Sequence, residues 1–256
     1  MAHVVAIINQ KGGVGKSTTA INLAACLGDL GKRVLVVDFD PQGNATSGFG
    51  VDKDSLESDV YESLMNDVPL SEVVVPSPVE GVFVAPATIQ LAGAEIELVS
   101  VMARESVLRY VLEPVRDAYD YIFVDCPPSM RLSSIFQVTA VDSVLIPIQC
   151  EFYALEGVSQ LMSTIDIVKK NLNPSLEIEG VILSMFDGRT NLSIQVVEEA
   201  KKYFKEKVYT TVIPRNVRLA EAPSHGVPVI HYDPRSTGAK AYTEFAEEFL
   251  EAEEGR

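Results

Sequence analysis

The chain has no tryptophan, only three cysteines, and 7% aromatic residues among its 256 residues. Cys26, Cys126 and Cys150 are widely separated in apolar segments, which favours reduced core thiols over disulfides or metal ligands. No C-x-x-C pair is present to hold an iron–sulfur cluster. Uninterrupted apolar runs stay below the ~18 residues of a membrane span, and the first run leads straight into a glycine-rich loop. We therefore expect neither a cleaved signal nor a membrane helix, and a cytoplasmic location.

Basic residues are also scarce. Lysine and arginine number 21 against 36 acidic residues, which leaves a net charge of −15. This balance excludes a protein that coats nucleic acid with its whole surface, so any DNA contact must be a local patch. Hydrophobic residues make up 47% and charged residues 22%, close to globular averages. The length suits one α/β domain with a sizeable core.

Apolar, β-branched segments alternate with stretches of helical periodicity. The predicted strands cover residues 3–8, 33–39, 82–85, 121–124, 143–148, 177–185 and 210–213. The predicted helices cover residues 59–66, 94–116, 155–171, 193–205 and 238–252. Such alternation is typical of an α/β fold with a mostly parallel, twisted sheet and helices on both faces. We expect a single domain over residues 1–256, because no repeat or low-complexity linker interrupts the chain.

The most informative stretch is N-Q-K-G-G-V-G-K-S-T at residues 9–18. Glycines let backbone N–H groups turn toward phosphates, a lysine serves the outer phosphates, and a hydroxyl binds magnesium. A phosphate-binding loop of this kind lies between a predicted strand and a predicted helix, and it consists of Gly12, Gly13, Val14, Gly15, Lys16, Ser17 and Thr18. Gln10 stands where the usual pattern has its first glycine, and Lys11 adds a second lysine. By itself, Lys11 could be an ordinary solvated lysine.

Together, these residues resemble the deviant Walker A loop of the ParA/MinD family of P-loop NTPases. In that family the early lysine, Lys11 here, reaches across a dimer interface to the partner's nucleotide. The resemblance implies ATP and Mg²⁺ as ligands, with Lys11 and Lys16 acting in catalysis. A guanine-specific N-K-x-D motif is absent.

Three aspartates follow predicted strands, where ligands of open α/β sheets bind. Asp38 and Asp40 belong to V-V-D-F-D-P-Q-G-N, and Asp125 ends Y-I-F-V-D before C-P-P-S. Turn formation before Pro41 is the ordinary alternative for Asp40. The resemblance implies that Asp40 orients the hydrolytic water. It also implies that Asp38 and Asp125 support magnesium through water beside Ser17, a sparse set that suits this ion.

The loop I-P-R-N matches the family's adenine loop, which makes Pro214 and Asn216 candidates for adenine binding. An ordinary proline turn explains the two residues equally well.

One stretch reverses the acidic balance. Residues 189–218 hold seven basic and three acidic residues. A solvated helix face explains Lys201, Lys202 and Lys205. The tracts F-D-G-R-T-N-L and I-P-R-N-V-R-L-A-E-A-P-S-H-G closely resemble chromosomal Soj-like ParA proteins, which implies that Arg189 and Arg218 contact DNA phosphates.

The C-terminal end separates this chain from membrane-binding relatives. MinD-like proteins end in a basic amphipathic helix, whereas residues 244–256 hold six glutamates and one arginine. Anionic lipid would repel such an end, so we expect no membrane partner.

The resemblance therefore implies a DNA-partitioning ATPase, weak without its partner and nucleoid-associated. It would form an ATP-bound homodimer on nonspecific double-stranded DNA, released when a ParB-type centromere-binding partner stimulates hydrolysis. Because the loop begins close to the N-terminus, we expect no helix-turn-helix region before it. A positioning ATPase for another cargo is the main alternative, and a MinD-like division regulator is a weaker one. The tract after the third aspartate departs from the Soj pattern at Met130 and Arg131, which bears on the partner response.

Overall fold

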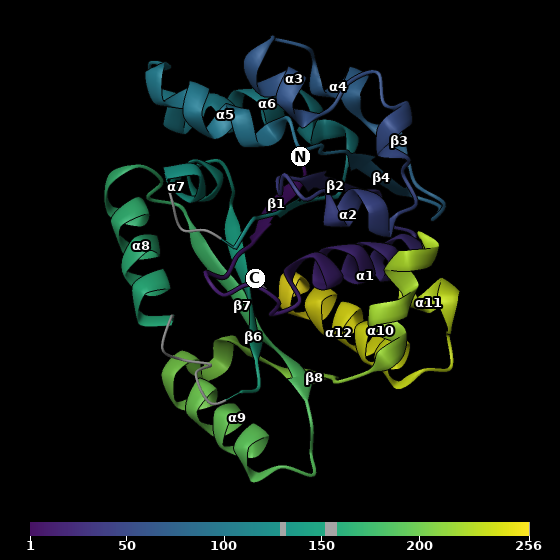
Figure 1. The fold of residues 1–256 in the computed structure, drawn as a ribbon. Helices are drawn as coiled ribbons and strands as arrows, with labels where there is room; N and C mark the ends of the chain where they lie inside the picture. The colour runs from purple at the N-terminus through teal and green to yellow at the C-terminus, as the bar shows by residue number, and fades with distance from the viewer. Residues whose placement is uncertain (129–131, 152–157, 256) are drawn as a thin grey trace.

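The computed structural model describes residues 1–128, 132–151 and 158–255. Within these ranges one sheet has the strand order β3-β4-β2-β5-β1-β6-β7-β8 (Figure 1). Its strands are β1 (His3–Ile7), β2 (Val34–Asp38), β3 (Val75–Pro76), β4 (Val82–Ala85), β5 (Tyr121–Asp125), β6 (Ser143–Gln149), β7 (Glu177–Phe186) and β8 (Val208–Pro214). All neighbouring strands run parallel except β3, which is antiparallel to β4. The predicted α/β class and mostly parallel sheet are confirmed.

Helices cover both faces of the sheet. On one face lie α1 (Lys16–Asp29), α2 (Asn44–Gly48), α10 (Val217–Glu221), α11 (Val229–Tyr232) and α12 (Thr237–Glu254). The other face carries α3 (Val60–Met65), α4 (Leu70–Val73), α5 (Leu91–Glu97), α6 (Val107–Leu112), α7 (Leu132–Thr139), α8 (Val158–Asn171) and α9 (Asn191–Phe204). No helix in the described part of the chain is long and apolar enough to cross a bilayer.

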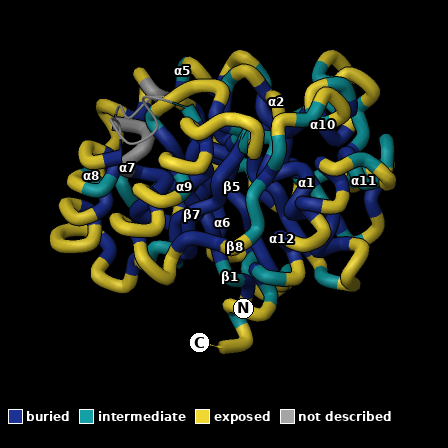
Figure 2. Tube along the Cα trace, turned by 90° about the horizontal axis from the view of Figure 1, so that it is seen from below, coloured by how far each residue is buried: buried dark blue, intermediate teal, exposed yellow. Residues whose placement is uncertain are grey.

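Side-chain alternation along the strands builds two cores. In β1, Val4 and Ala6 join the core beneath α5 to α9, whereas Val5 and Ile7 join the core beneath α1 and α12. All four residues are fully buried, because a central parallel strand is covered on both faces. Figure 2 shows this buried interior surrounded by exposed helix faces and loops.

The last helix is the amphipathic closing element that its spacing predicts. Tyr242, Phe245 and Phe249 point inward and are almost fully buried. Phe249 packs edge-on against Tyr121 of β5, with ring centroids 5.5 Å apart. Ser236 caps the start of α12 by accepting a hydrogen bond from the backbone N–H of Ala239. Aromatic burial on this scale holds α12 firmly against the sheet.

One sequence prediction is wrong. The apolar pattern over residues 94–116 predicted a single helix, but the chain there forms α5, η2 (Leu98–Ser100), η3 (Arg104–Ser106), α6 and η4 (Glu113–Ala118). The break comes where Val101 is extended and Ala103 is left-handed, with φ 54°. Neither conformation can continue an α-helix.

The short edge strand β3 was not predicted. Pro76 belongs to it and pairs with Phe83 of β4, at a sheet edge where a missing N–H is tolerated. Other strand predictions agree with the structure to within about two residues, as is usual at element ends. The start of the predicted helix over residues 155–171 lies outside the described residues.

Candidate nucleotide-binding site

The phosphate-binding loop joins the end of β1 to the start of α1. Gly13 and Gly15 have φ 75° and 93°, a region that favours glycine. The Asn9 side chain anchors the loop, donating to the Pro147 carbonyl at 2.7 Å and accepting from the Lys11 N–H at 2.9 Å. The Ser184 hydroxyl donates to the Val14 carbonyl at 2.7 Å. Neighbouring strands β6 and β7 thus fix the loop from outside.

Lys16 lies inside this loop and is only 6% exposed. Its ammonium donates to the Lys11 carbonyl at 3.3 Å. Burial lowers the pKa of Lys16, while the charges of Asp125, Cys126 and Asp40 partly offset the decrease. A cation held inside a phosphate-binding loop is suited to meet phosphate charge.

Asp38 ends β2 and is paired in register with Asp125, the last residue of β5. Both side chains are completely buried. Asp38 accepts hydrogen bonds from the Asp40 N–H at 3.1 Å, the Thr46 N–H at 2.8 Å and the Thr46 hydroxyl at 2.7 Å. Burial raises the pKa of Asp38 to about 6, and these hydrogen bonds limit the rise. The Asp38 carboxylate therefore uses most of its hydrogen-bonding positions to fix the loop after β2.

Asp125 differs from Asp38 in its hydrogen bonding. Neither of its buried carboxylate oxygens has a hydrogen-bond partner of ordinary geometry among the described residues. Burial and the neighbouring Asp38 raise its pKa well above the usual value, with a smaller opposite effect from the Ser17 hydroxyl. A buried carboxylate with free lone pairs beside a serine of the phosphate loop fits a hydrated magnesium ion. The donor set proposed for Mg²⁺ is therefore chemically suitable.

Asp40 lies just beyond the strand, where the chain turns. Its side chain is 7% exposed and accepts from the Gln42 N–H at 2.9 Å, so the expected turn geometry is present. Asp40 also lines a cleft of about 470 Å³, together with Gly12, Lys16 and Ser17. The structure thus brings this carboxylate to the cleft at the phosphate loop.

A second hollow of about 230 Å³ lies beside the phosphate loop. Pro214, at the end of β8, and Asn216, which caps α10, line it next to Gly15 and Thr18. Asn216 donates to the Thr237 hydroxyl at 2.6 Å and accepts from the Arg218 N–H at 2.8 Å. The structure is therefore compatible with both interpretations of Pro214 and Asn216. The two residues form a turn and a helix cap, and they also line the hollow beside the phosphate loop.

Sequence reasoning missed several residues around this hollow. Leu219 and Ala220 line both cavities, and Tyr242 lines the smaller one. Met185 also lines both, with φ 52°, a left-handed conformation that costs a non-glycine residue about 1–3 kcal/mol. No local pattern marks these positions, because they meet only when β7, α10 and α12 converge.

Lys11, unlike the buried Lys16, lies at the surface. Its side chain is 42% exposed, and its ammonium lies 3.6 Å from the Glu151 carboxylate. Glu151 also pairs with Arg215 at 3.3 Å. The two lysines of the loop therefore occupy different environments, one enclosed and one at the surface.

Arg189 and Arg218 both lie at the surface near this edge of the sheet. Arg189 is 90% exposed and bonds Asp187 through two nitrogens, at 2.8 and 2.7 Å. Arg218 is half exposed and contacts Glu221 at 2.7 Å and Asp233 at 3.2 Å. Because β7 and β8 are paired at their ends, the segment that carries Arg189 and the segment that leads into α10 with Arg218 leave the same edge of the sheet. Both guanidinium groups are paired with carboxylates of this chain.

A larger groove of about 900 Å³ lies elsewhere, between the region after α2 and strand β3. Glu57, Glu62 and Glu72 line it, and no lysine or arginine does. A groove without cations cannot neutralise phosphate charge, so it suits a nucleotide less well than the clefts at the phosphate loop. Met130 and Arg131, the departure from the Soj pattern, lie outside the described residues.

This fold and loop define a P-loop nucleotide-binding protein with a second, surface-exposed lysine. A family model described as an AAA domain matches residues 2–178. The chain is 60% identical over 248 residues to the sporulation initiation inhibitor protein Soj of Bacillus subtilis, covering 97% of this chain and 98% of that protein. It is 52% identical over 250 residues to the chromosome partitioning protein ParA of Myxococcus xanthus, covering 98% and 88%.

Among solved structures, a Mycobacterium smegmatis protein described as cobyrinic acid a,c-diamide synthase, with bound ATP analogue and magnesium, has a TM-score of 0.87. It is 36% identical to this chain, and the match covers 100% of this chain and 98% of that one. The chain belongs to the ParA/Soj family, whose members include chromosome-partitioning ATPases.

Proposed function

We propose that this chain is an ATP-switched DNA-partitioning ATPase that works as a dimer. The observation that carries the proposal is the different placement of its two loop lysines. Lys16 is buried in its own phosphate loop, whereas Lys11 is at the surface, where exchanging its ion pair with Glu151 would let it serve a nucleotide held by a second copy. A lysine used in this way makes the complete catalytic site depend on dimer formation.

Hydrolysis in this proposal relies on electrostatics and positioning. Lys16 and the partner's copy of Lys11 neutralise charge that develops on the transferred phosphoryl group. Asp40 holds the attacking water, and its turn with Gln42 fixes the carboxylate at the edge of the cleft. Magnesium, held by Ser17 and through water by Asp125 and Asp38, would supply charge neutralisation at the phosphates. Asp38 additionally orders the loop that carries Asp40 through its bonds to Thr46.

The smaller hollow is proposed to receive the adenine. Its lining combines Pro214, Leu219 and the ring of Tyr242 with the polar side chain of Asn216, next to Gly15 of the phosphate loop. An apolar slot with few polar groups suits a flat heterocycle. The amide of Asn216 already bonds Thr237, so this residue orders the slot as well as facing it.

DNA is proposed to bind at the edge that carries Arg189 and Arg218. In one chain this patch is small, and each arginine is paired with carboxylates. A dimer presents two patches to one duplex, which doubles the phosphate contacts without reading any base. ATP would thereby switch binding on, and stimulation of hydrolysis by a ParB-type partner would switch it off. Such a protein is expected on the nucleoid.

DNA binding measured with ATP, ADP or no nucleotide, across a salt series, tests the proposal. The wild type should bind duplex tightly only with ATP. Lys16→Ala should lose nucleotide binding and therefore DNA binding, whereas Asp40→Ala should bind ATP, dimerise and hold DNA without hydrolysing the nucleotide. Normal hydrolysis by Asp40→Ala would remove the role assigned to that carboxylate.

Arg218→Glu tests the DNA surface separately from the nucleotide site. Two phosphate contacts disappear per dimer, so the salt slope should fall by roughly 2 and binding should weaken strongly. Lys169→Glu, the same charge change on the exposed face of α8, is the matched control and should leave binding unchanged. Equal DNA affinity for Arg218→Glu and wild type at low salt would mean that the duplex binds elsewhere.

A further inference from the structure

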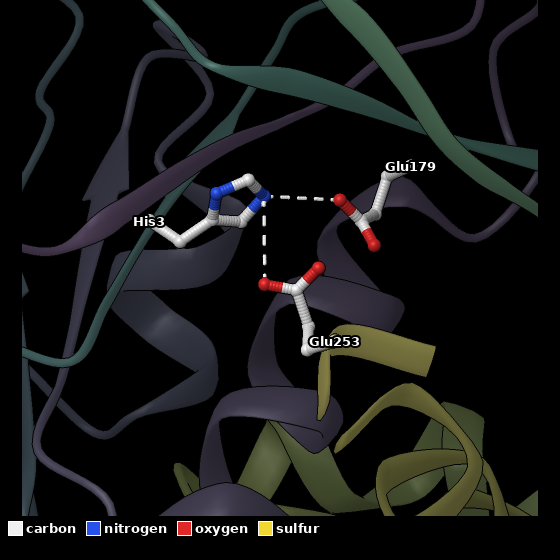
Figure 3. A group of neighbouring side chains, drawn as sticks. All are labelled: His3, Glu179 and Glu253. Carbon is white, nitrogen blue, oxygen red and sulfur yellow. Dashed lines mark hydrogen bonds and ion pairs between the residues drawn. The ribbon is translucent and has the colours of Figure 1, made fainter. Parts of the chain in front are cut away.

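Three possible metal ligands meet at the sheet edge opposite the nucleotide site. His3 is the first residue of β1, Glu179 lies near the start of β7, and Glu253 lies in the last turn of α12. Figure 3 shows the His3 ring directed between the two carboxylates. Its Nε2 lies 3.0 Å from Glu179 Oε2 and 3.9 Å from Glu253 Oε2. One ligand atom from each residue falls within 4.8 Å of the other two.

We propose that His3, Glu179 and Glu253 bind a divalent transition-metal ion of the zinc type. Zinc bonds of about 2.0–2.2 Å to imidazole nitrogen and carboxylate oxygen place tetrahedral ligand atoms about 3.3 Å apart. The two distances from His3 Nε2 lie on either side of this value. Small side-chain adjustments therefore suffice to close the set around one ion.

The surroundings suit a bound cation that can exchange with solvent. The Glu179 side chain is fully buried, whereas those of His3 and Glu253 are 26% and 16% exposed. The enclosed carboxylate gives a fixed ligand, and the open side provides an entry path and room for a water as fourth ligand. The Ser143 hydroxyl donates to Glu179 Oε2 at 2.7 Å and orients that carboxylate.

The charge around His3 is negative. Burial alone lowers the pKa of His3, but its hydrogen bond to Glu179 and the charges of Glu253, Glu179 and Asp142 raise the pKa above its ordinary value. The same carboxylates that favour a proton on the ring favour a metal dication in its place. Because imidazole is part of the set, zinc, cobalt or nickel is preferred over magnesium or calcium.

A metal at this position would link the beginning of the chain to its last helix. His3 and Glu253 are 250 positions apart in sequence, and the contact between them joins the two elements at this edge (Figure 3). Such a link stabilises the native state, because the three ligands come together only in the folded chain. The site is independent of the proposed ATPase cycle, whose residues lie at the other end of the strands.

Metal titration of the full chain, nucleotide-free and treated with chelator beforehand, tests this proposal at pH 8. Competition with a chromophoric chelator gives the Zn²⁺ affinity, and Co²⁺ absorption reports coordination. Wild type should bind one Zn²⁺ per chain, and Tm should rise by roughly 5 °C at 100 times the dissociation constant. Mg²⁺ should cause no comparable rise. Four-coordinate Co²⁺ bands without thiolate charge transfer are expected.

Loss of a residue that only hydrogen-bonds to a metal ligand lowers metal affinity about 10- to 100-fold. His3→Gln and Glu253→Gln remove ligands, so each should lower Zn²⁺ affinity by more than this. His231→Gln is the matched control, because His231 pairs with Asp29 at 3.3 Å. Glu251→Gln, exposed on the same helix, controls for Glu253. Melting without metal confirms that each variant folds. Affinity equal in the ligand and control variants, or thiolate bands from a cysteine site, would overturn the proposal.

Discussion

Lys11 and Glu151 form an ion pair, with the lysine ammonium 3.6 Å from a carboxylate that also pairs with Arg215 at 3.3 Å. The lysine proposed to serve a second subunit is therefore engaged within its own chain. Dimer formation must exchange this carboxylate for the phosphates of the partner's nucleotide. We therefore expect Glu151 to weaken ATP-dependent dimerisation.

Glu151→Gln should promote ATP-dependent dimerisation. In the wild-type dimer each subunit must break its exposed Lys11–Glu151 ion pair, which is worth about 0.2–1 kcal/mol. The variant has neither pair to break, so the dimer dissociation constant should fall roughly 2- to 30-fold. Sedimentation equilibrium with ATP, in an Asp40→Ala background that prevents turnover, measures this change. Glu199→Gln, on the exposed face of α9, is the matched control. An unchanged dissociation constant would show that the Lys11–Glu151 pair does not restrain assembly.

Asp125→Asn should stabilise the nucleotide-free protein while impairing magnesium-dependent nucleotide binding. In the wild type the buried Asp125 carboxylate has no hydrogen-bond partner of ordinary geometry within the described part of the chain, and its pKa is raised by burial and by Asp38. Removing the charge should increase the free energy of unfolding by about 1–2 kcal/mol at pH 8. Chemical denaturation with and without Mg²⁺-ATP checks both effects.

The pH dependence of Asp125→Asn follows from the raised pKa. The unfolded carboxyl loses its proton near pH 4, whereas the folded one keeps it to higher pH. Wild-type stability from this group therefore falls as pH rises above about 4, and the advantage of Asp125→Asn should grow over that interval. An advantage that is the same at pH 4 and pH 8 would indicate a packing effect instead.

Asp187→Asn should strengthen binding to nonspecific duplex. Asp187 holds Arg189 through two hydrogen bonds, and this pairing lowers the pKa of the carboxyl to about 2. Asparagine keeps the turn made with the Arg189 N–H but removes a charge that DNA phosphates must displace. We expect roughly 2- to 5-fold tighter binding with ATP at low salt, diminishing at high salt. Fluorescence anisotropy measures it, and a loss of affinity would contradict the pairing argument.

Local patterns predicted most of the framework. Buried β-branched runs located the central strands, because a parallel strand covered on both faces is apolar throughout. The helix over residues 94–116 was predicted wrongly, since its apolar spacing is compatible with a helix while the backbone at Ala103 is left-handed. Strand β3 is too short to carry a period of its own, and only its pairing with β4 defines it.

The sequence by itself determined the phosphate loop, because loop glycines, lysines and hydroxyls act through backbone geometry that neighbours in the chain create. It also determined which aspartates follow strands, and hence the edge where they meet. Only the tertiary structure shows that, among the described residues, Asp125 has no hydrogen-bond partner of ordinary geometry while Asp38 accepts from three donor groups, since burial and strand register set hydrogen bonding. The pairing of Lys11 with Glu151 and the contact of His3 with Glu253 are likewise not visible in the sequence. Such contacts join residues far apart in the chain, and only the packing of β1, β6 and α12 brings them together.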